Sequence, residues 1–455
     1  MADLLQALAA HAAGHDDAAT GLPALRANGS LADAVRRQPR LSQAERAASL
    51  AVLAELKHAS PSAGALLATS ASQYFTAVRQ GGACGISAVT AGGRFGGSVQ
   101  VLRDAHAAGL PTLMKDFVTA ERQLDVAVQH GASAVLLIER LVGDGRESLV
   151  RAAHDRGLEV LLEVHGAREA ARVPGSRADL LGVNSRDLDS LAIDVPAALP
   201  VVAQLARARP DVPTLLLSGV DAHAGAEDAR AAGASGLLVG TALLRARHAA
   251  TTLRSLRRAV VKVCGNQSLG DVAAADGADL IGVIVGTGSA RDVPLALVPD
   301  LFRLARAQDA AAVAVTRDQS AHALLDLARG LRPDFLQVHG ALDAATVQAV
   351  QARGVGILQA IVPGQDPLPG VDGTVTDTTA EGGSGRPHGG RTPGGPGLHL
   401  VAGGLDAASA ATALRTSGAA GTDASSGLET LCRKDPVKVR AFIAATQAAR
   451  RTHGA

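Results

Sequence analysis

Aromatic side chains are scarce in this chain: tryptophan is absent, tyrosine occurs once, and Phe, Trp and Tyr together make up 2% of the 455 residues. Proteins that hold single-stranded nucleic acid stack its bases on aromatic rings, and contacts with a phosphate backbone require an excess of basic residues. Here 44 Lys and Arg face 43 Asp and Glu, a net charge of +1. The composition therefore argues against nucleic acid as a partner and provides no attraction to an anionic membrane.

Cysteine is equally rare, and Cys84, Cys264 and Cys432 form no CxxC pair. Such isolated cysteines are typical of reduced thiols, so we expect a cytoplasmic protein. No uninterrupted apolar run reaches the ~18 residues that a membrane span needs. Residues 1–15 are helix-like but lack a basic n-region and a cleavage pattern, so we expect no secretion. No dinucleotide glycine fingerprint follows the first strand and no His/Cys cluster has ligand spacing, so we expect no cofactor and no metal.

From residue 51 onward, short Val/Ile/Leu-rich runs alternate with helix-like stretches, a pattern typical of βαβ units and a parallel sheet. The first eight expected strands are Ala51–Glu55, Gly85–Val89, Thr112–Lys115, Ala134–Ile138, Glu159–Glu163, Leu180–Asn184, Thr214–Leu217 and Gly236–Val239. A second eight follow at Val260–Val263, Leu280–Val285, Ala311–Val315, Phe335–Val338, Val355–Ala360, Gly373–Thr376, Leu398–Ala402 and Gly421–Asp423. Two consecutive sets of eight predict an α/β fold of two tandem (β/α)8 TIM barrels. An open doubly wound sheet is the structural alternative.

The domain boundary is expected near residue 256. Residues 1–256 would form a barrel with an N-terminal helical extension, and residues 257–455 a second barrel. The segment Arg245–Arg258 is basic and helical without a Pro/Gly/Ser spacer. We therefore expect the last helix of the first barrel to run almost directly into the second, with a fixed interface. Residues 380–397 are rich in Gly and Pro, which predicts a mobile loop.

Polar residues of the first half recur at the carboxyl ends of the strands, the face where barrels place their active sites. They are Glu55, Lys57, Lys115, Glu163, Asn184 and Arg186. A single charged residue at a strand end is usually only solvated, but polar residues at the ends of four strands favour a common site. Two lysines and two glutamates in one mouth can also tune each other's pKa, so that one donates and another accepts a proton. Small residues at the ends of strands seven and eight, Ser218-Gly219 and Gly240-Thr241, suit a phosphate, with ordinary turns as the alternative.

In the second half, Cys264 stands at the end of the first strand, and Asp377 follows the sixth, nearly opposite. A lone buried cysteine is more often a small apolar residue, but at a barrel mouth it is a candidate base. The pair could supply the base and the acid for moving a proton between neighbouring carbons. Two further turns, Gly403-Gly404 and Ser425-Ser426, again suit phosphate.

The segments Ala54–Ser62, Met114–Phe117, Leu162–His165 and Gly182–Leu188 resemble the indole-3-glycerol phosphate synthase family over about residues 25 to 250. This family closes the indole ring of carboxyphenylamino-deoxyribulose phosphate with loss of CO₂ and water. The resemblance implies that Lys115 protonates the substrate carbonyl, that Glu163 stabilises or relays the proton at the anilino nitrogen, and that Glu55 and Lys57 serve the dehydration. Further residues implied to hold the substrate and its phosphate are Ser60, Asn184, Arg186, Ser218, Gly219, Gly240 and Thr241. Phe95 and Phe117 are candidates for packing on the anthranilate ring, or equally for the core.

The segments Val260–Gly265, Gly288–Arg291, Leu336–Gly340, Ala402–Leu405 and Asp423–Glu429 resemble phosphoribosylanthranilate isomerase over about residues 259 to 446. In that family a cysteine base and an aspartic acid perform an Amadori rearrangement. The resemblance implies that Cys264 takes the proton from C2 of the ribose while Asp377 protonates the ring oxygen. It assigns the anthranilate carboxylate to Arg291 and the phosphate to Gly403, Gly404, Ser425 and Ser426. His339 is a possible substrate contact or a structural histidine.

The two reactions are consecutive steps of tryptophan biosynthesis, so the sequence is interpreted as a bifunctional enzyme that acts on small phosphorylated anthranilates. Leu217 and Ala91 replace acidic residues that the synthase family usually has, and Ala290 replaces a proline of the isomerase family. One alternative is that only the isomerase half is active and the first barrel is a scaffold. Another is a non-catalytic pair of phosphate-binding barrels. We expect a monomer.

Overall fold

The computed structural model describes residues 24–37, 49–57, 59–60, 64–65, 70–92, 96–317, 319–378 and 390–449. The predicted N-terminal extension lies largely outside these ranges, as do Phe95, the side chain of Ser60 and most of the predicted loop 380–397. The chain divides into two compact units, the first up to Arg245 and the second from Ala246, with the short segment Ala222–Ala224 grouped with the second. In the described ranges, none of the helices has the length and apolar character to cross a membrane.

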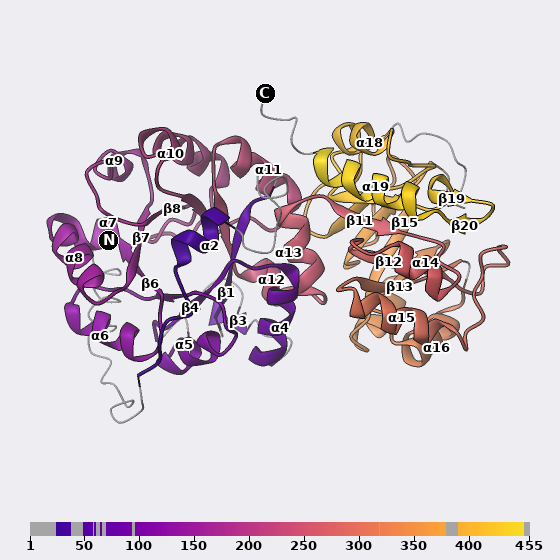
Figure 1. Ribbon diagram of the computed structural model, residues 1–455, viewed down its shortest axis with the longest axis horizontal. Helices are drawn as coiled ribbons and strands as arrows, with labels where there is room; N and C mark the ends of the chain where they lie inside the picture. The colour runs from indigo at the N-terminus through magenta and orange to yellow at the C-terminus, as the bar shows by residue number, and fades with distance from the viewer. Residues whose placement is uncertain are drawn as a thin grey trace. The chain divides into compact units, whose positions relative to one another are not determined.

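The first unit is a closed barrel of eight parallel strands in which β1 pairs with both β10 and β4 (Figure 1). Its strands are β1 (Ala51–Leu56), β4 (Gly85–Val89), β5 (Thr112–Lys115), β6 (Ala134–Ile138), β7 (Glu159–Val164), β8 (Leu180–Asn184), β9 (Thr214–Leu217) and β10 (Gly236–Val239). The helices of this unit are α2 (Leu31–Arg37), α4 (Ala71–Gly81), α5 (Val99–His106), α6 (Glu121–Gln129), α7 (Glu139–Val142), α8 (Arg146–Asp155), α9 (Ala167–Ala170), α10 (Val195–Ala208), α11 (His223–Ala231) and α12 (Thr241–Arg245). The turn η2 (Gly143–Gly145) and a short hairpin, β2 (Ala59–Ser60) with β3 (Gly64–Ala65), complete it.

The second unit repeats this architecture, with β11 closing the barrel against β18. Its strands are β11 (Val260–Val263), β12 (Leu280–Ile284), β13 (Ala311–Arg317), β14 (Phe335–His339), β15 (Gly356–Ile361), β16 (Gly373–Thr376), β17 (Leu398–Val401) and β18 (Gly421–Ala424). Its helices are α13 (Ala249–Arg257), α14 (Leu269–Ala274), α15 (Val298–Ala307), α16 (Ala321–Leu331), α17 (Ala344–Gln351), α18 (Ala410–Ser417) and α19 (Pro436–Ala448). After β18 come η3 (Ser426–Leu428) and a hairpin of β19 (Glu429–Thr430) with β20 (Arg433–Lys434).

The predicted tandem TIM-barrel fold is therefore confirmed, and each predicted strand agrees with an observed one to within two residues at either end. The agreement has a simple cause. Strands of a barrel are buried by side chains inside and by helices outside, so they form continuous apolar runs that end abruptly where the chain reaches the mouth. All six residues of β1, for example, are buried.

The segment predicted as one helix between the barrels is divided. Helix α12 ends at Arg245, and α13 begins at Ala249. Helix α13 packs on the second barrel, where Arg254 Nε lies 3.7 Å from Asp279 Oδ1. Arg258, just after the helix, binds the same carboxylate at 2.7 Å. The second compact unit consequently includes this helix.

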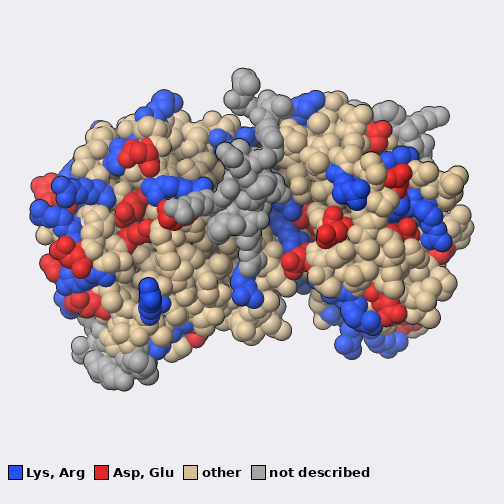
Figure 2. Space-filling view, viewed as in Figure 1, with Lys and Arg blue, Asp and Glu red and all other residues tan. Residues whose placement is uncertain are grey.

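Charged side chains on both barrels are of mixed sign. On the face shown in Figure 2, lysine and arginine are interspersed with aspartate and glutamate, and the totals of basic and acidic residues in the chain are nearly equal. The carboxyl ends of the strands, in contrast, gather specific charged pairs inside each barrel mouth.

Candidate active sites

A cavity at the mouth of the first barrel collects most of the predicted polar residues of that half. The predicted residues that line it are Glu55, Lys57, Lys115, Glu163, Asn184, Arg186 and Ser218. Its other lining residues are Val89, Ala91, Asp116, Phe117, Leu136, Ile138, Leu188 and Leu191. Residues from six different strands thus converge on one cavity. Apolar side chains form part of its lining and can face an aromatic ring.

Glu55 is held between two lysines at the end of β1. Its Oε1 lies 2.6 Å from Lys57 Nζ, and its Oε2 lies 3.1 Å from Lys115 Nζ. Burial raises the pKa of Glu55, but the two ammonium groups outweigh it and bring the pKa down to about 2. Burial in turn lowers the pKa of Lys115, and the carboxylates of Glu55 and Glu163 raise it above its ordinary value. At neutral pH the site therefore holds an ionised carboxylate beside a protonated Lys115.

Glu163, at the end of β7, is almost completely buried, with 1% of its surface exposed. Its Oε1 accepts a hydrogen bond from Asn184 Nδ2 at 3.0 Å and lies 3.2 Å from His165 Nε2. Burial raises its pKa, but His165, Lys115 and Asn184 bring the pKa below the ordinary value. Asn184 also accepts from the backbone N–H of Arg186 at 3.0 Å, so that one amide side chain aligns both neighbours.

The predicted phosphate residues of the first barrel lie at the ends of β9 and β10. Ser218 lines the cavity, and both Ser218 (φ 66°) and Gly219 (φ 75°) adopt left-handed backbone geometry in the turn. Gly240 lies against the charged cluster, because a Cβ there would be 2.6 Å from Glu55 Oε1. Gly219, Gly240 and Thr241 are not among the lining residues, although they stand at the same strand ends.

The two replaced acidic positions differ in their surroundings. Leu217 is buried in the barrel interior, where its side chain covers Gly182: a Cβ on that glycine would lie 2.8 Å from Leu217 Cδ1. Ala91 instead lines the cavity. Nearby, Asp116, which was not selected from the sequence as a site residue, also lines the cavity and accepts a hydrogen bond from Thr90 Oγ1 at 2.6 Å.

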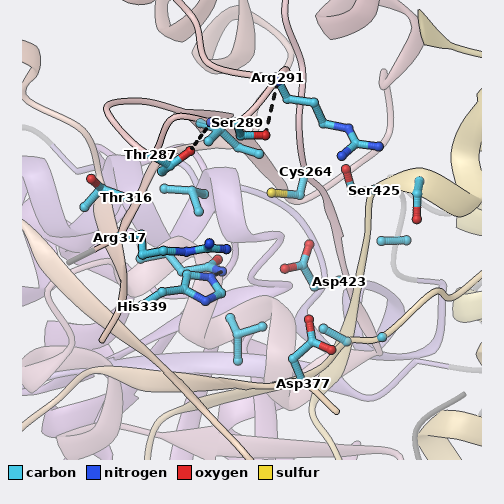
Figure 3. A pocket seen from close by; sticks show the side chains of 18 of the residues that line it. Cys264, Thr287, Ser289, Arg291, Thr316, Arg317, His339, Asp377, Asp423 and Ser425 are labelled. Atoms are coloured by element: carbon cyan, nitrogen blue, oxygen red, sulfur yellow. Dashed lines mark hydrogen bonds between the residues drawn. The ribbon is translucent and has the colours of Figure 1, made fainter. Parts of the chain in front are cut away.

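The mouth of the second barrel holds another cavity, shown in Figure 3, and its lining contains every site residue predicted for that half. These residues are Cys264, Arg291, His339, Asp377, Gly403, Gly404, Ser425 and Ser426. The cavity is also lined by Ile284, Thr287, Ser289, Val315, Thr316, Arg317, Gln337, Val375, Ala402, Asp423 and Ala424. In the view of Figure 3, Cys264, Asp423 and Asp377 lie along one side, and Arg317 and His339 along the other.

Cys264 stands beside a buried ion pair. Lys262 Nζ lies 2.8 Å from Asp423 Oδ2, and Lys262 has no exposed surface. Burial raises the pKa of the Cys264 thiol, the neighbouring Lys262 lowers it, and the pKa remains above its ordinary value. Lys262 and Asp423 were not selected from the sequence as site residues. The sequence pattern could have identified them, because side chains two residues apart in a strand point the same way and barrel closure places the first strand beside the eighth.

Arg291 makes a bidentate contact with Glu429, which begins the hairpin that follows the last strand of the barrel. Its Nε and NH2 donate to Glu429 Oε1 and Oε2 at 3.0 and 2.7 Å. Lys434 Nζ donates to Glu429 Oε1 at 2.7 Å and to the backbone oxygen of Ser425 at 3.1 Å. The hairpin β19–β20 therefore holds both Arg291 and the serine turn in place.

His339 and Arg317 stand opposite each other in the register of β14 and β13. Gln337 Nε2 lies 2.9 Å from His339 Nε2, which accepts the amide proton in the tautomer that carries its ring proton on Nδ1. Arg317, a second guanidinium in this cavity, was not selected from the sequence. The strand was predicted to end at Val315, two residues before Arg317, where β13 ends.

Comparisons with known proteins divide the chain in the same way as the barrels. A model of the family "Indole-3-glycerol phosphate synthase" matches residues 15–256. A model of the family "N-(5'phosphoribosyl)anthranilate (PRA) isomerase" matches residues 261–445. The indole-3-glycerol phosphate synthase of Halobacterium salinarum is 39% identical over 194 residues, 42% of this chain and 75% of that protein. The corresponding protein of Deinococcus radiodurans is 36% identical over 237 residues, 52% of this chain and 80% of that protein. Among solved structures, TrpF from Jonesia denitrificans is 25% identical, with a TM-score of 0.37 and coverage of 42% of this chain and 98% of that one.

Proposed function

Because the chain belongs to the indole-3-glycerol phosphate synthase family in its first half and carries a phosphoribosylanthranilate isomerase domain in its second, we propose that the two barrel mouths are the two active sites. The chain is a bifunctional enzyme of tryptophan biosynthesis. Its second barrel isomerises N-(5-phosphoribosyl)anthranilate to carboxyphenylamino-deoxyribulose phosphate. Its first barrel closes the indole ring of that product, with loss of CO₂ and water.

In the synthase barrel, Lys115 acts as the general acid that protonates the substrate carbonyl oxygen as the new carbon–carbon bond forms. The support is electrostatic: Glu55 at 3.1 Å raises the pKa of Lys115, so the ammonium form is available at neutral pH. Glu163, ionised and directed into the cavity, stabilises or relays the proton at the anilino nitrogen. Glu55 and Lys57, paired at 2.6 Å, serve the dehydration.

Substrate placement in this barrel falls to Asn184, Arg186 and the turns after β9 and β10. Ser60, Ser218, Gly219, Gly240 and Thr241 hold the substrate and its phosphate, because small residues and turn N–H groups admit a phosphate closely. Phe117 lines the cavity and can face the anthranilate ring.

In the isomerase barrel, the Cys264 thiolate removes the proton from C2 while Asp377 protonates the ring oxygen, so that the ribose ring opens as the new double bond forms. Both side chains line one cavity, and the Lys262 ammonium favours the thiolate over the thiol. Arg291 binds the anthranilate carboxylate, and Gly403, Gly404, Ser425 and Ser426 bind the phosphate. His339 contacts the substrate from the opposite wall.

A monomer suffices for this scheme, because each cavity is lined by residues of its own barrel. We also place the enzyme in the cytoplasm, since all three cysteines are free thiols. The domain boundary proposed near residue 256 is supported by the end of the first family match at that residue, whereas the compact units divide earlier, after Arg245.

One observation carries the proposal: in each barrel the ionisable residues expected to do the chemistry line a single cavity. The test is to assay the purified chain with each substrate separately, alongside Lys115→Ala and Cys264→Ala. We expect Lys115→Ala to abolish ring closure and spare the isomerisation, and Cys264→Ala to do the reverse. Loss of both activities in either variant, with the protein still folded by circular dichroism, would show that the assignments are wrong.

A further inference from the structure

A row of alternating charges extends from the synthase cavity toward the surface through β7 and α9. Glu163 Oε1 lies 3.2 Å from His165 Nε2, and His165 Nδ1 lies 3.6 Å from Glu169 Oε2. Arg140 Nε continues the row with a 2.9 Å contact to Glu169 Oε1. The signs alternate from carboxylate to imidazole to carboxylate to guanidinium, so each group favours the charged form of the next.

Only the first member of this row reaches the substrate space. Glu163 lines the cavity, whereas the lining residues include neither His165 nor Glu169. The His165 side chain is 3% exposed, and that of Arg140, at the outer end, is 35% exposed. His165 can therefore act on the reaction only through Glu163, as a positioning residue rather than a catalytic one.

The two oxygens of Glu163 have different surroundings. Oε1 is occupied, since it accepts from Asn184 and lies against the His165 ring. Oε2 is buried and has no hydrogen-bond partner within the described part of the chain. Fixing one oxygen leaves the other in a defined position, where it can receive a proton from the substrate.

We propose that His165, charged and held from behind by Glu169, fixes Glu163 as a carboxylate and directs its Oε2 toward the anilino nitrogen of the substrate. This inference rests on the proposed role of Glu163. The backbone supports the geometry as well, because the N–H of His165 donates to Glu169 Oε2 at 2.9 Å and ties the loop to the first turn of α9.

The electrostatics agree in direction. Burial lowers the pKa of His165, but Glu163 and Glu169 raise it to about 9, so the imidazole is cationic at neutral pH. Burial raises the pKa of Glu169, and His165 and Arg140 bring it down to about 2. The groups that face His165 are Glu163 on its own strand and Glu169 on α9, while Arg140 and Lys115 act from the far sides of these carboxylates.

The experiment measures synthase kcat/KM against pH for the full chain and for His165→Gln, which keeps a hydrogen-bond donor but removes the charge. Without the cation the pKa of Glu163 rises, so the acid limb of the profile should move up by about one pH unit, a common effect of one neighbouring charge. Glu169→Gln should move the limb the same way by less, since His165 then keeps only one carboxylate. The isomerase profile of the same protein should not move.

Asp125→Asn, an exposed carboxylate-to-amide change elsewhere on this barrel, serves as the matched control and should leave both profiles unchanged. A fall in synthase activity that is equal at every pH, or an unmoved acid limb in both variants, would overturn the inference and leave His165 a structural residue. A further variant, Glu163→Gln, distinguishes a failure of the inference about His165 from a failure of the proposed function. If that variant keeps synthase activity, the role of Glu163 itself is wrong.

Discussion

Lys262 and Asp423 form a buried ion pair across the seam where the second barrel closes, with 2.8 Å between Nζ and Oδ2. The two residues are direct partners in the register of β11 and β18. Cys264 follows directly after the end of β11, two residues beyond Lys262, and a Cβ built on Gly282 would be 2.9 Å from its sulfur and 3.2 Å from Lys262 Nζ. The ammonium group and the thiol therefore flank the same point at the barrel mouth.

Replacing Lys262 should weaken the proposed base of the isomerase. In Lys262→Met the thiol loses the neighbouring cation that lowers its pKa, so its pKa rises. Because the thiolate is the active form, we expect the acid limb of isomerase kcat/KM to move to higher pH. Alkylation of Cys264 by iodoacetamide, followed by mass spectrometry, should slow by about tenfold at neutral pH, the factor that one pKa unit gives. Unchanged alkylation would contradict this account, and exposed Cys432 in the same sample reports the reagent's activity.

Thermal unfolding should show how far the lost ion pair destabilises Lys262→Met. Lys262→Met leaves Asp423 as a buried carboxylate without its partner, which typically costs about 3–5 kcal/mol. Lys262→Met/Asp423→Asn removes both charges and should unfold at a higher temperature than the single variant. If the double variant is no more stable than the single one, the pair is not the source of the loss.

Glu55→Gln should shift the synthase profile at its basic limb. Glu55 raises the pKa of Lys115, so removing its charge lowers that pKa, and the proposed general acid loses its proton at lower pH. We expect the basic limb of synthase kcat/KM to move down by about one pH unit or more, with the isomerase profile as the internal control. A basic limb that stays in place would mean that Lys115 is not the acid whose ionisation limits the reaction.

The lowered pKa of Glu55 also makes the stability of the first barrel depend on pH. Its pKa of about 2 lies below the ordinary 4.5, so its ion pairs stabilise the folded first barrel above pH 4.5, and that stability is lost as pH falls toward 2. Thermal unfolding followed between these pH values should show the first barrel weakening more steeply in the unmodified chain than in Glu55→Gln. Equal slopes would contradict the depressed pKa.

The sequence predicted the strands and the ionisable residues proposed for catalysis because both depend on local pattern: apolar runs give the strands, and the polar residues at their ends give part of the lining of each mouth. It did not predict which charges pair. Arg291 and Glu429 are 138 positions apart, and their contact depends on how the hairpin β19–β20 folds over the mouth. His165 was visible in its motif, but its link to Glu169 requires the short helix α9, whose four residues are too few to produce a periodic signal.

Arg291→Met should raise the isomerase KM with little change in kcat, because the proposed role of Arg291 is to bind the anthranilate carboxylate. Loss of a charge-assisted bidentate contact costs about 1.5–3 kcal/mol, or roughly 10- to 100-fold in KM. Glu429→Gln, which only loosens the hold on Arg291, should raise KM less. Steady-state kinetics of both variants test this. If KM is unchanged in Arg291→Met, then the carboxylate binds elsewhere, and Arg317, the other arginine that lines this cavity, is the candidate.

Two glycines allow a steric test of each mouth without removing a functional group. A Cβ at Gly240 would lie 2.6 Å from Glu55 Oε1 and 3.2 Å from Lys57 Nζ, and one at Gly282 would lie 2.9 Å from Cys264 Sγ. Neither glycine has a positive φ, so alanine strains the contacts and not the backbone. Gly240→Ala should lower synthase kcat at least tenfold by displacing the Glu55–Lys57 pair, and Gly282→Ala should lower isomerase kcat likewise, since small misplacements of catalytic groups are costly. Gly145→Ala, with no atom near its Cβ, is the control and should leave both rates unchanged. If Gly240→Ala impairs the isomerase as much as the synthase, the two mouths do not work as separate sites.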